Sequence, residues 1–431
     1  MLTMQPPKHR LLYSIRKTAG VLPKFFIWVV LLAFEAHAQE VRLTQVIDLA
    51  LTSHPTVLQA RSQAQAAGFD LDAAKWGRYP SLSSEVRSDS AYTQSIAKLE
   101  QPLWAGGRID GRVAVGEANV RVAAASVQEA QINALVQASS AFFEMLRLIT
   151  RLDKARDNEQ EHQKLVGLIE RRVQAQISPP ADLTLAQARL QQATTDRLQV
   201  QRQLESTRSS LTQWIGPIGT QGTFVAPRQI VYERAPNHEA LIEQAMQVSG
   251  QRQKLLAQID SANAQIDLAK AQGMPTVVAG YQHIVSGPLV PGSDRGRAYV
   301  GMQFQPGAGL SALSGIQSSV SKKEAAEQEL QVFERSLEAQ LKTLYSDIDV
   351  LQAQMGPAQA LERDTADLVD SYLRQYQIGR KNWLDVLNAL REKAQAIYSI
   401  TDVRYALSQS QVRLLILNGV LPAQKETVIH E

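Results

Sequence analysis

Two stretches of the chain decide its fold, residues 182–214 (DLTLAQARLQQATTDRLQVQRQLESTRSSLTQW) and residues 385–417 (DVLNALREKAQAIYSITDVRYALSQSQVRLLIL). They match in register at an offset of 203 residues. One heptad stripe starts at Leu183 in the first stretch and at Val386 in the second, and a companion stripe starts three residues further on. A seven-residue apolar repeat keeps one seam of a helix against a neighbouring helix, so both stretches predict left-handed coiled coils.

The match extends along most of the chain, which predicts an internal duplication. We expect a first repeat over residues 39–216, a linker with three prolines over 217–236, a second repeat over 237–422 and a disordered tail over 423–431. Three further pairs of dipeptides support the alignment: Tyr79-Pro80 with Met274-Pro275, Gln101-Pro102 with Gln305-Pro306, and Gln176-Ile177 with Gln377-Ile378.

Each repeat has the same predicted order: a helix, two strands, a long helix, a turn and a second helix. We expect the first helix over residues 44–77, with a break at His54-Pro55. The absence of proline between residues 107 and 177 predicts a helix of about 70 residues, roughly 105 Å long at 1.5 Å per residue. Its apolar stripe slips by one position, which predicts altered winding or a break near residue 150.

Proline and glycine mark the turns of the two helical hairpins. Ser178-Pro179-Pro180 ends the long helix of the first repeat, because proline cannot continue it. In the second repeat we expect the long helix to start near residue 311, to be interrupted at Gly356-Pro357 and to turn at Gly379.

Four segments alternate between apolar and polar residues, as strands with two different faces do. Such segments suit a membrane β-barrel, with one face toward lipid and the other toward water. An ordinary half-exposed antiparallel sheet would give the same alternation. The residues that we expect to face lipid are Leu82, Val86, Leu99, Val277, Tyr281, Val300, Met302 and Phe304.

The first 38 residues read as a signal peptide. Basic residues precede the apolar run at 25–34, and Ala36-His37-Ala38 resembles a cleavage site. Five of the 45 basic residues and one of the 42 acidic residues lie in this segment, so the net charge of +3 becomes −1 after its removal. A chain this close to neutral is not expected to bind nucleic acid. No later stretch approaches 18 apolar residues, so we expect no membrane-spanning helix.

Three short segments, residues 101–108 (QPLWAGGR), 374–379 (RQYQIG) and 383–389 (WLDVLNA), resemble the TolC-like outer membrane channel family. The resemblance implies a mainly α-helical chain with a small membrane β portion, located in the outer membrane of a Gram-negative bacterium. It implies a homotrimer with four strands per subunit in one twelve-stranded barrel, continued by a helical tunnel in the periplasm. Its implied partners are outer membrane lipid, a periplasmic adaptor (membrane fusion) protein and an inner-membrane ABC transporter or other pump. Independently, four strands cannot close a barrel, so strands in a membrane require oligomerisation.

The same resemblance assigns roles to the two hairpin tips. Polar contacts of Asp182, Tyr376, Lys381 and Asp385 are expected to close the periplasmic aperture. The tip residues expected to contact the adaptor are Ile177, Ser178, Pro179, Gly379 and Arg380. Alternatively, Asp182 and Asp385 only complement the N-terminal ends of their helices.

The sequence favours transport over catalysis. It contains no Walker loop, HExxH or GxSxG motif, and its seven histidines are scattered, so we expect no enzyme activity, cofactor or metal. The stretch at 379–389 resembles channels of adhesin-exporting type I secretion systems. The chain also contains no cysteine, which modestly favours secretion because many efflux channels carry a lipidated one. The alternatives are a small-molecule efflux channel and a coiled-coil structural protein without a pore.

Overall fold

The first repeat begins with two helices divided at a proline. In the computed structural model, α1 spans Leu43–Ser53 and α2 spans Pro55–Trp76. Pro55 takes the first helical position, where a backbone N–H would have no hydrogen-bond acceptor within the helix. The N–H of Thr56 donates to Nδ1 of His54 at 3.3 Å, which caps α2. The division predicted at His54-Pro55 is confirmed.

The structure describes residues 40–88, 92–220, 222–227, 238–289, 293–305, 307–309 and 311–420. The predicted signal peptide, the tail and half of the linker (residues 221 and 228–236) lie outside these residues. The described residues form one compact unit, in which helices of the first repeat pack against helices of the second.

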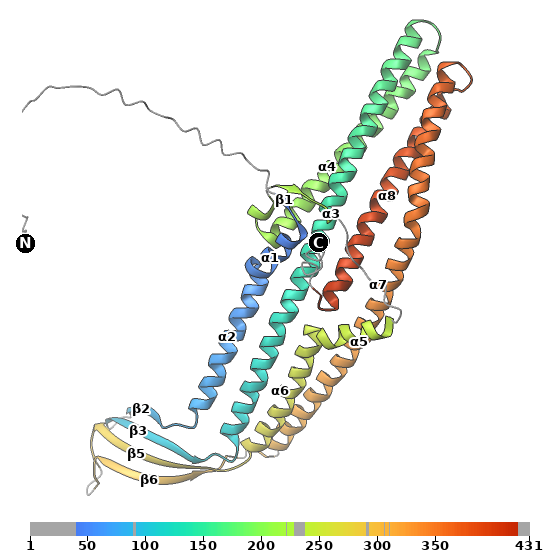
Figure 1. Cartoon of the computed structure of the whole chain (residues 1–431). Coiled ribbons are helices and arrows are strands. Elements are labelled where there is room, and N and C mark those ends of the chain that lie inside the picture. The colour runs from blue at the N-terminus through green and yellow to red at the C-terminus, as the bar shows by residue number, and fades with distance from the viewer. Residues whose placement is uncertain are drawn as a thin grey trace, which may run out of the picture. The chain divides into compact units, whose positions relative to one another are not determined.

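Two long helical hairpins dominate the fold (Figure 1). The first consists of α3 (Arg108–Gln174) and α4 (Pro180–Ile215), and the second of α7 (Ser311–Gln377) and α8 (Trp383–Leu417). Both α3 and α7 contain 67 residues. The slip of the apolar stripe near residue 150 causes no break in α3.

The interruption predicted at Gly356-Pro357 is wrong, because α7 continues through Pro357. Proline removes one backbone hydrogen bond, but Gly356 and Pro357 both lie on the exposed side of the helix. Ile348 before this point and Val369 after it are buried, so packing holds the helix on both sides of the defect.

Shorter elements connect the hairpins. Helix α5 (His238–Val248) precedes α6 (Gly250–Gln272), whose start is capped by the Ser249 hydroxyl accepting from the N–H of Arg252. A 3₁₀ turn, η1 (Ile218–Thr220), follows α4. Strand β1 (Glu40–Val41) pairs in parallel with β4 (Thr223–Phe224), a pairing that the sequence did not predict.

The four predicted strands form one antiparallel sheet. They are β2 (Ser81–Ser88), β3 (Thr93–Trp104), β5 (Thr276–Ser286) and β6 (Gly296–Gln303), in the order β2-β3-β5-β6. The central contact between β3 and β5 joins the two repeats. Helices α2 and α6 lead into β2 and β5, and strands β3 and β6 lead into α3 and α7. The four helices pack side by side in the order of the strands that they adjoin, α2-α3-α6-α7.

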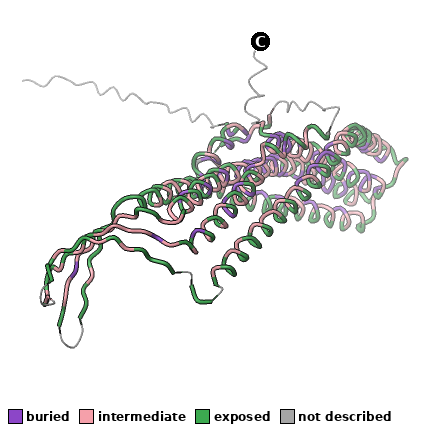
Figure 2. The backbone as a smooth tube through the Cα atoms, turned by 90° about the horizontal axis from the view of Figure 1, so that it is seen from below, coloured by how far each residue is buried: buried purple, intermediate pink, exposed green. Residues whose placement is uncertain are grey.

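Most buried residues lie in the helices, whereas the outer strands are mainly exposed and the central strands β3 and β5 are mainly half-buried (Figure 2). One apolar cluster joins α1, α3, α4 and the end of α8, and contains Phe142, Phe143 and Leu211. A second cluster lies near the hairpin tips, and a third joins α5 to α7. Among the described residues, none of the helices is long and apolar enough to cross a membrane.

Candidate functional site

One face of the four-stranded sheet carries the apolar residues that the alternation singled out. Leu82 pairs with Leu99, and Leu99 pairs with Tyr281, so these three side chains lie in one row. Val277 pairs with Met302 on the same face. Leu82 is 78% exposed and Met302 is 73% exposed, far from the burial expected of a core. The sheet therefore presents an uncovered apolar face.

The opposite face of the sheet is polar. Glu85 accepts hydrogen bonds from Arg87 at 2.7 Å and from Lys98 at 3.2 Å. The Tyr299 hydroxyl donates to Glu100 across Gly280, and a Cβ at Gly280 would collide with the Tyr299 ring. The alternation predicted from the sequence thus becomes two chemically different faces.

The two outer strands of this sheet are open. Among the described strands, β2 pairs only with β3 and β6 pairs only with β5, so each is an edge strand of the sheet. Because the four strands alternate in direction, β2 and β6 run antiparallel to each other. The β2 edge of one copy could therefore pair with the β6 edge of another in a regular antiparallel ladder.

The tip of the first hairpin is a tight turn with a strained residue. Gln176 has φ +60°, in the left-handed region that few residues other than glycine adopt. The N–H of Ile177 donates to the carbonyl of Arg172, and Ile177 is 63% exposed. Pro179 precedes the first residue of α4, and Asp182 lies in the first turn of that helix.

The tip of the second hairpin makes the same kind of turn with glycine. Gly379 has φ +75°, and the N–H of Arg380 donates to the carbonyl of Gln375 at 2.9 Å. The Asn382 side chain caps α8 by accepting from the N–H of Asp385 at 2.9 Å. A carboxylate at this place also complements the helix dipole.

Aromatic side chains behind the second tip join the two hairpins. The rings of Tyr376 and Trp383 lie 5.6 Å apart, and both residues are at most 5% exposed. The guanidinium of Arg172, from α3, lies 4.7 Å from the centre of the Tyr376 ring. Among the described residues, the Tyr376 hydroxyl and the Trp383 indole N–H have no hydrogen-bond partner. Packing and a cation–π contact, not polar pairing of Tyr376, therefore hold the tips together within one chain.

The four residues that the family resemblance assigned to the aperture occupy three different environments. Lys381 and Asp385 form an ion pair at 3.6 Å, and Lys381 also lies 4.3 Å from the centre of the Tyr372 ring. Tyr376 is buried in the tip core, whereas Asp182 is half-buried on the first hairpin. The structure brings only Lys381 and Asp385 together, and the closing role of all four stays a prediction.

A series of polar contacts joins α3 to α8 below the tips. Arg147 and Arg151 both donate to Asp402, at 2.7 and 2.8 Å. The pKa of Arg147 is raised, chiefly by its hydrogen bonds to Glu144 and then by Asp402, so this guanidinium stays charged. Arg151 also lies 4.6 Å from the centre of the Tyr398 ring. We call Arg147, Arg151 and Asp402 the arginine clamp.

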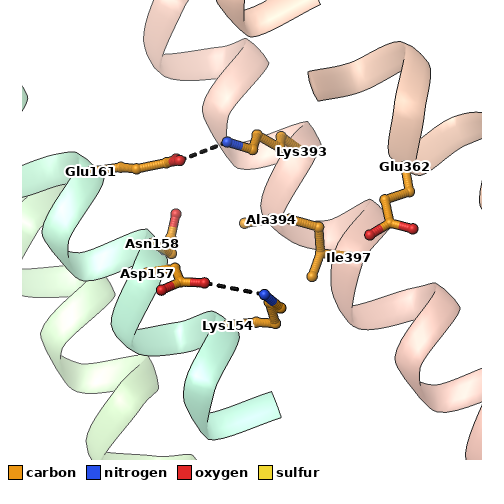
Figure 3. Close-up of a pocket in the computed structure, with 8 residues that line it drawn as sticks. All are labelled: Lys154, Asp157, Asn158, Glu161, Glu362, Lys393, Ala394 and Ile397. Atoms are coloured by element: carbon orange, nitrogen blue, oxygen red, sulfur yellow. Dashed lines mark hydrogen bonds and ion pairs between the residues drawn. The ribbon is translucent and has the colours of Figure 1, made fainter. Parts of the chain in front are cut away.

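A small cavity lies further along the same seam, where α3 meets α7 and α8 (Figure 3). Its volume is about 200 Å³. Lys393 donates to Glu161 at 2.6 Å and Lys154 donates to Asp157 at 3.2 Å, while Glu362 lines the α7 side. A space lined by paired charges suits water better than an apolar ligand. No group of three potential metal ligands occurs within the described residues.

Sequence reasoning missed the residues that join the hairpins. Arg172, Asp402 and Lys393 each contact a residue of the other repeat. Their signal is weak because charged residues beside an apolar heptad stripe are common on any exposed helix. A prediction that α8 packs against α3 as well as against α7 would have pointed to these three residues.

Solved structures share this arrangement of strands and hairpins. The CmeC outer membrane channel of Campylobacter jejuni matches with a TM-score of 0.73 at 13% identity, over 88% of this chain and 85% of that chain. The outer membrane protein VceC of Vibrio cholerae matches with a TM-score of 0.73 at 16% identity, over 88% and 96%. The MtrE outer membrane channel of Neisseria gonorrhoeae matches with a TM-score of 0.68 at 14% identity, over 88% and 89%. The fold is that of outer membrane channel proteins.

The sequence comparison identifies the family. The outer membrane efflux protein family model matches residues 46–217 and 241–420. The chain therefore belongs to the outer membrane efflux protein family, of the TolC-like channel type, and its place is the outer membrane. It is also 23% identical over 254 residues to protein CyaE of Bordetella pertussis. That match spans 55% of this chain and about half, 53%, of the relative.

Proposed function

We propose that three copies of this chain form one channel, with four strands each in a twelve-stranded barrel and two hairpins each in a periplasmic tunnel. One observation carries the proposal: a sheet whose apolar face is uncovered and whose two edges are open. In hydrocarbon an open strand edge is too costly, so the edges need partners. Three copies give twelve strands, an even number that an antiparallel barrel requires.

The helices support the same arrangement. Because α2, α3, α6 and α7 pack in the order of their strands, α2 and α7 lie at the two outer sides of one chain. Phe69 on α2 is 73% exposed, and Val332 on α7 is 68% exposed. Apolar side chains at both outer sides suit contact with α7 and α2 of neighbouring copies.

The hairpin tips are the proposed contact with a periplasmic adaptor and inner-membrane pump. Ile177 and Ile378 lie in the turns of the first and second hairpin, and both are more than 60% exposed. Asp385 and Lys381 would line the aperture in three copies, where a ring of carboxylates favours cations. Asn388 is neutral, which limits the negative charge of such a ring.

For the cargo, we propose protein of the adhesin type, exported in a type I secretion system. The support is the resemblance of residues 379–389 to such channels and the absence of cysteine from the chain. The alternative is the outer membrane component of a multidrug or small-molecule efflux pump. Deletion of the gene tests this directly. Loss of a protein from the culture medium supports export, whereas increased drug sensitivity with an unchanged set of secreted proteins supports efflux.

Assembly can be tested by disulfide trapping, because the chain has no cysteine of its own. A panel of variants with one cysteine in β2 and one in β6 should give covalent trimers under oxidation. As the matched control, Ala97→Cys with His283→Cys joins two paired positions of β3 and β5 inside one chain, so it should stay monomeric on a denaturing gel. A wild-type protein that is monomeric in outer membranes and forms no conducting channels in planar bilayers would contradict the proposal.

A further inference from the structure

One transverse row on the polar face of the sheet carries positive charge and no carboxylate. Lys98 of β3 pairs with Ser83 of β2 on one side and with Gln282 of β5 on the other. Gln282 in turn pairs with Arg297 of β6. Paired residues of neighbouring strands point to the same face, so these four side chains lie side by side. We call Ser83, Lys98, Gln282 and Arg297 the basic row.

The two carboxylates of the polar face lie in the rows on either side, and both already have partners. Glu85 accepts hydrogen bonds from Arg87 at 2.7 Å and from Lys98 at 3.2 Å. Glu100 accepts a hydrogen bond from the Tyr299 hydroxyl. Neither carboxylate contacts the β6 end of the basic row.

Arg297 supplies an uncompensated positive charge. It is exposed, and it makes no hydrogen bond or ion pair with any residue that the structure describes. The polar face carries three cations, Arg87, Lys98 and Arg297, and two carboxylates, so one positive charge per chain remains. Just before β6, the charges of Asp294 and Arg295 offset each other. The apolar face carries no Asp, Glu, Lys or Arg among the described strand residues.

We propose that the basic row binds acidic segments of a polypeptide that passes through the barrel, so that the barrel favours acidic over basic cargo. The inference rests on the proposed channel function, in which the polar face of the sheet lines the lumen. Three copies triple the excess charge, and the low dielectric constant of the surrounding wall strengthens its field in the lumen.

The spacing of the two cations suits an extended acidic chain. Lys98 and Arg297 lie two strands apart, which is about 10 Å at the ordinary spacing of strands. Three residues of an extended polypeptide also span about 10 Å, so one acidic segment can place a carboxylate on each cation. At the far end of the tunnel, Asp385 is paired with Lys381 at 3.6 Å, which weakens its repulsion of such a cargo.

A neighbouring copy is the competing partner for Arg297. Arg297 lies on the edge strand β6 and Glu85 lies on the edge strand β2, and the proposed barrel joins these two edges. A pair between them would leave the net charge of the lumen unchanged, because it brings in no further carboxylate. Lys98 lies on β3, which is flanked by β2 and β5 of its own chain, so it faces the lumen in either case.

Polymer block in planar bilayers tests the basic row in the intact exported protein. The protein is added to one side, where its polar helices stay because they cannot cross hydrocarbon, so the barrel opens on the other side. Polyglutamate on the barrel side should block the current at about 0.1 M salt, where the Debye length is about 10 Å. Polylysine of the same length should not. Lys98→Gln combined with Arg297→Gln should raise the polyglutamate concentration for half block at least about tenfold.

Two further variants show whether charge is the cause. Lys98→Arg combined with Arg297→Lys keeps both charges and should keep the block. Glu100→Gln removes one carboxylate from the same face, so it should lower the concentration for half block by about threefold. The conductance without polymer shows that each variant has folded and inserted.

The outcomes separate this inference from the channel proposal. A conducting protein that polyglutamate does not block, or whose block is the same in the double Gln variant, would overturn the basic row alone. Block by a sulfated polysaccharide but not by polyglutamate would assign the face to another class of polyanion, and would also overturn it. A protein that forms no conducting channels would contradict the proposed function itself, and the basic row with it.

Discussion

The two hairpin tips come from one duplicated sequence, yet they fix their turns by different means. The first tip uses proline at the start of α4 and places Gln176 in a left-handed conformation. The second tip uses Gly379 for the left-handed residue and Asn382 to cap α8. The second tip is also anchored from behind by the buried ring of Trp383. Its stability therefore comes from packing, whereas that of the first tip comes mainly from the backbone.

This difference teaches that equivalent positions in a duplicated protein can tolerate different substitutions. Position 180, the counterpart of Trp383 at the offset of 203 residues, is a proline at the start of a helix. The apolar cluster near the tips draws most of its buried residues from the second hairpin. Four predictions can break or sharpen this comparison.

The largest effect is expected from Trp383→Ala. Removing a buried aromatic ring leaves a cavity, and we expect a loss of about 3–5 kcal/mol in the free energy of local unfolding of the second tip. Hydrogen exchange of peptides covering residues 365–395 measures this loss. The neighbouring Leu384→Ala is the control, because Leu384 is 50% exposed and its truncation should cost less than about 0.5 kcal/mol. Equal losses in the two variants would contradict the anchoring role.

A smaller loss is expected from Asp402→Asn in the arginine clamp. The amide cannot balance the charge of Arg151, whose side chain is about three-quarters buried, whereas Arg147 keeps its ion pair with Glu144. We expect α8 to lose about 2 kcal/mol against local unfolding, measured by hydrogen exchange. Asp157→Asn is the matched control, since its ion pair with Lys154 is exposed and should contribute about 0.5 kcal/mol. If both variants behaved alike, the clamp would be only another surface ion pair.

Substitutions of the left-handed residues in the two tips should change the local stability in opposite directions. Gly379→Ala adds a Cβ to a residue with φ +75° and should destabilise the second tip by about 1 kcal/mol. Gln176→Gly removes the same strain from the first tip and should stabilise it by up to about 1 kcal/mol. No other heavy atom lies within 4 Å of a Cβ at Gly379, so only the backbone conformation changes in energy. Hydrogen exchange measures the free energy of local unfolding of both tips. If both substitutions changed it in the same direction, the two turns would not be equivalent.

Most of the fold could be predicted from the sequence, because each element has a local cause. The division at His54-Pro55, the turn before Pro180 and the alternation around Leu82 each depend on a few neighbouring residues. The prediction at Pro357 was wrong because burial on both sides of a proline outweighs one lost hydrogen bond. Packing at a distance thus overrides a local signal.

The candidate site was less predictable, because its contacts join residues far apart in the sequence. Arg172 meets Tyr376 and Arg147 meets Asp402 only once the two hairpins lie together. The set of residues expected to face lipid needed no such information, since alternation along each strand already places its members on one face of the sheet. Periodicity therefore predicts which residues share one face of a strand or helix. It does not predict which charged residues of two separate helices come into contact.

The smallest effect on stability is expected at the tip ion pair. Lys381→Met removes a half-exposed pair with Asp385, so the second tip should lose at most about 0.5 kcal/mol. If three copies of Asp385 line the aperture, freeing this carboxylate should raise the preference for cations over anions in planar-bilayer recordings. Asp385→Asn should lower that preference, while Asp182→Asn tests the equivalent position of the first tip. A selectivity that follows Asp182 and ignores Asp385 would place the constriction on the first hairpin instead.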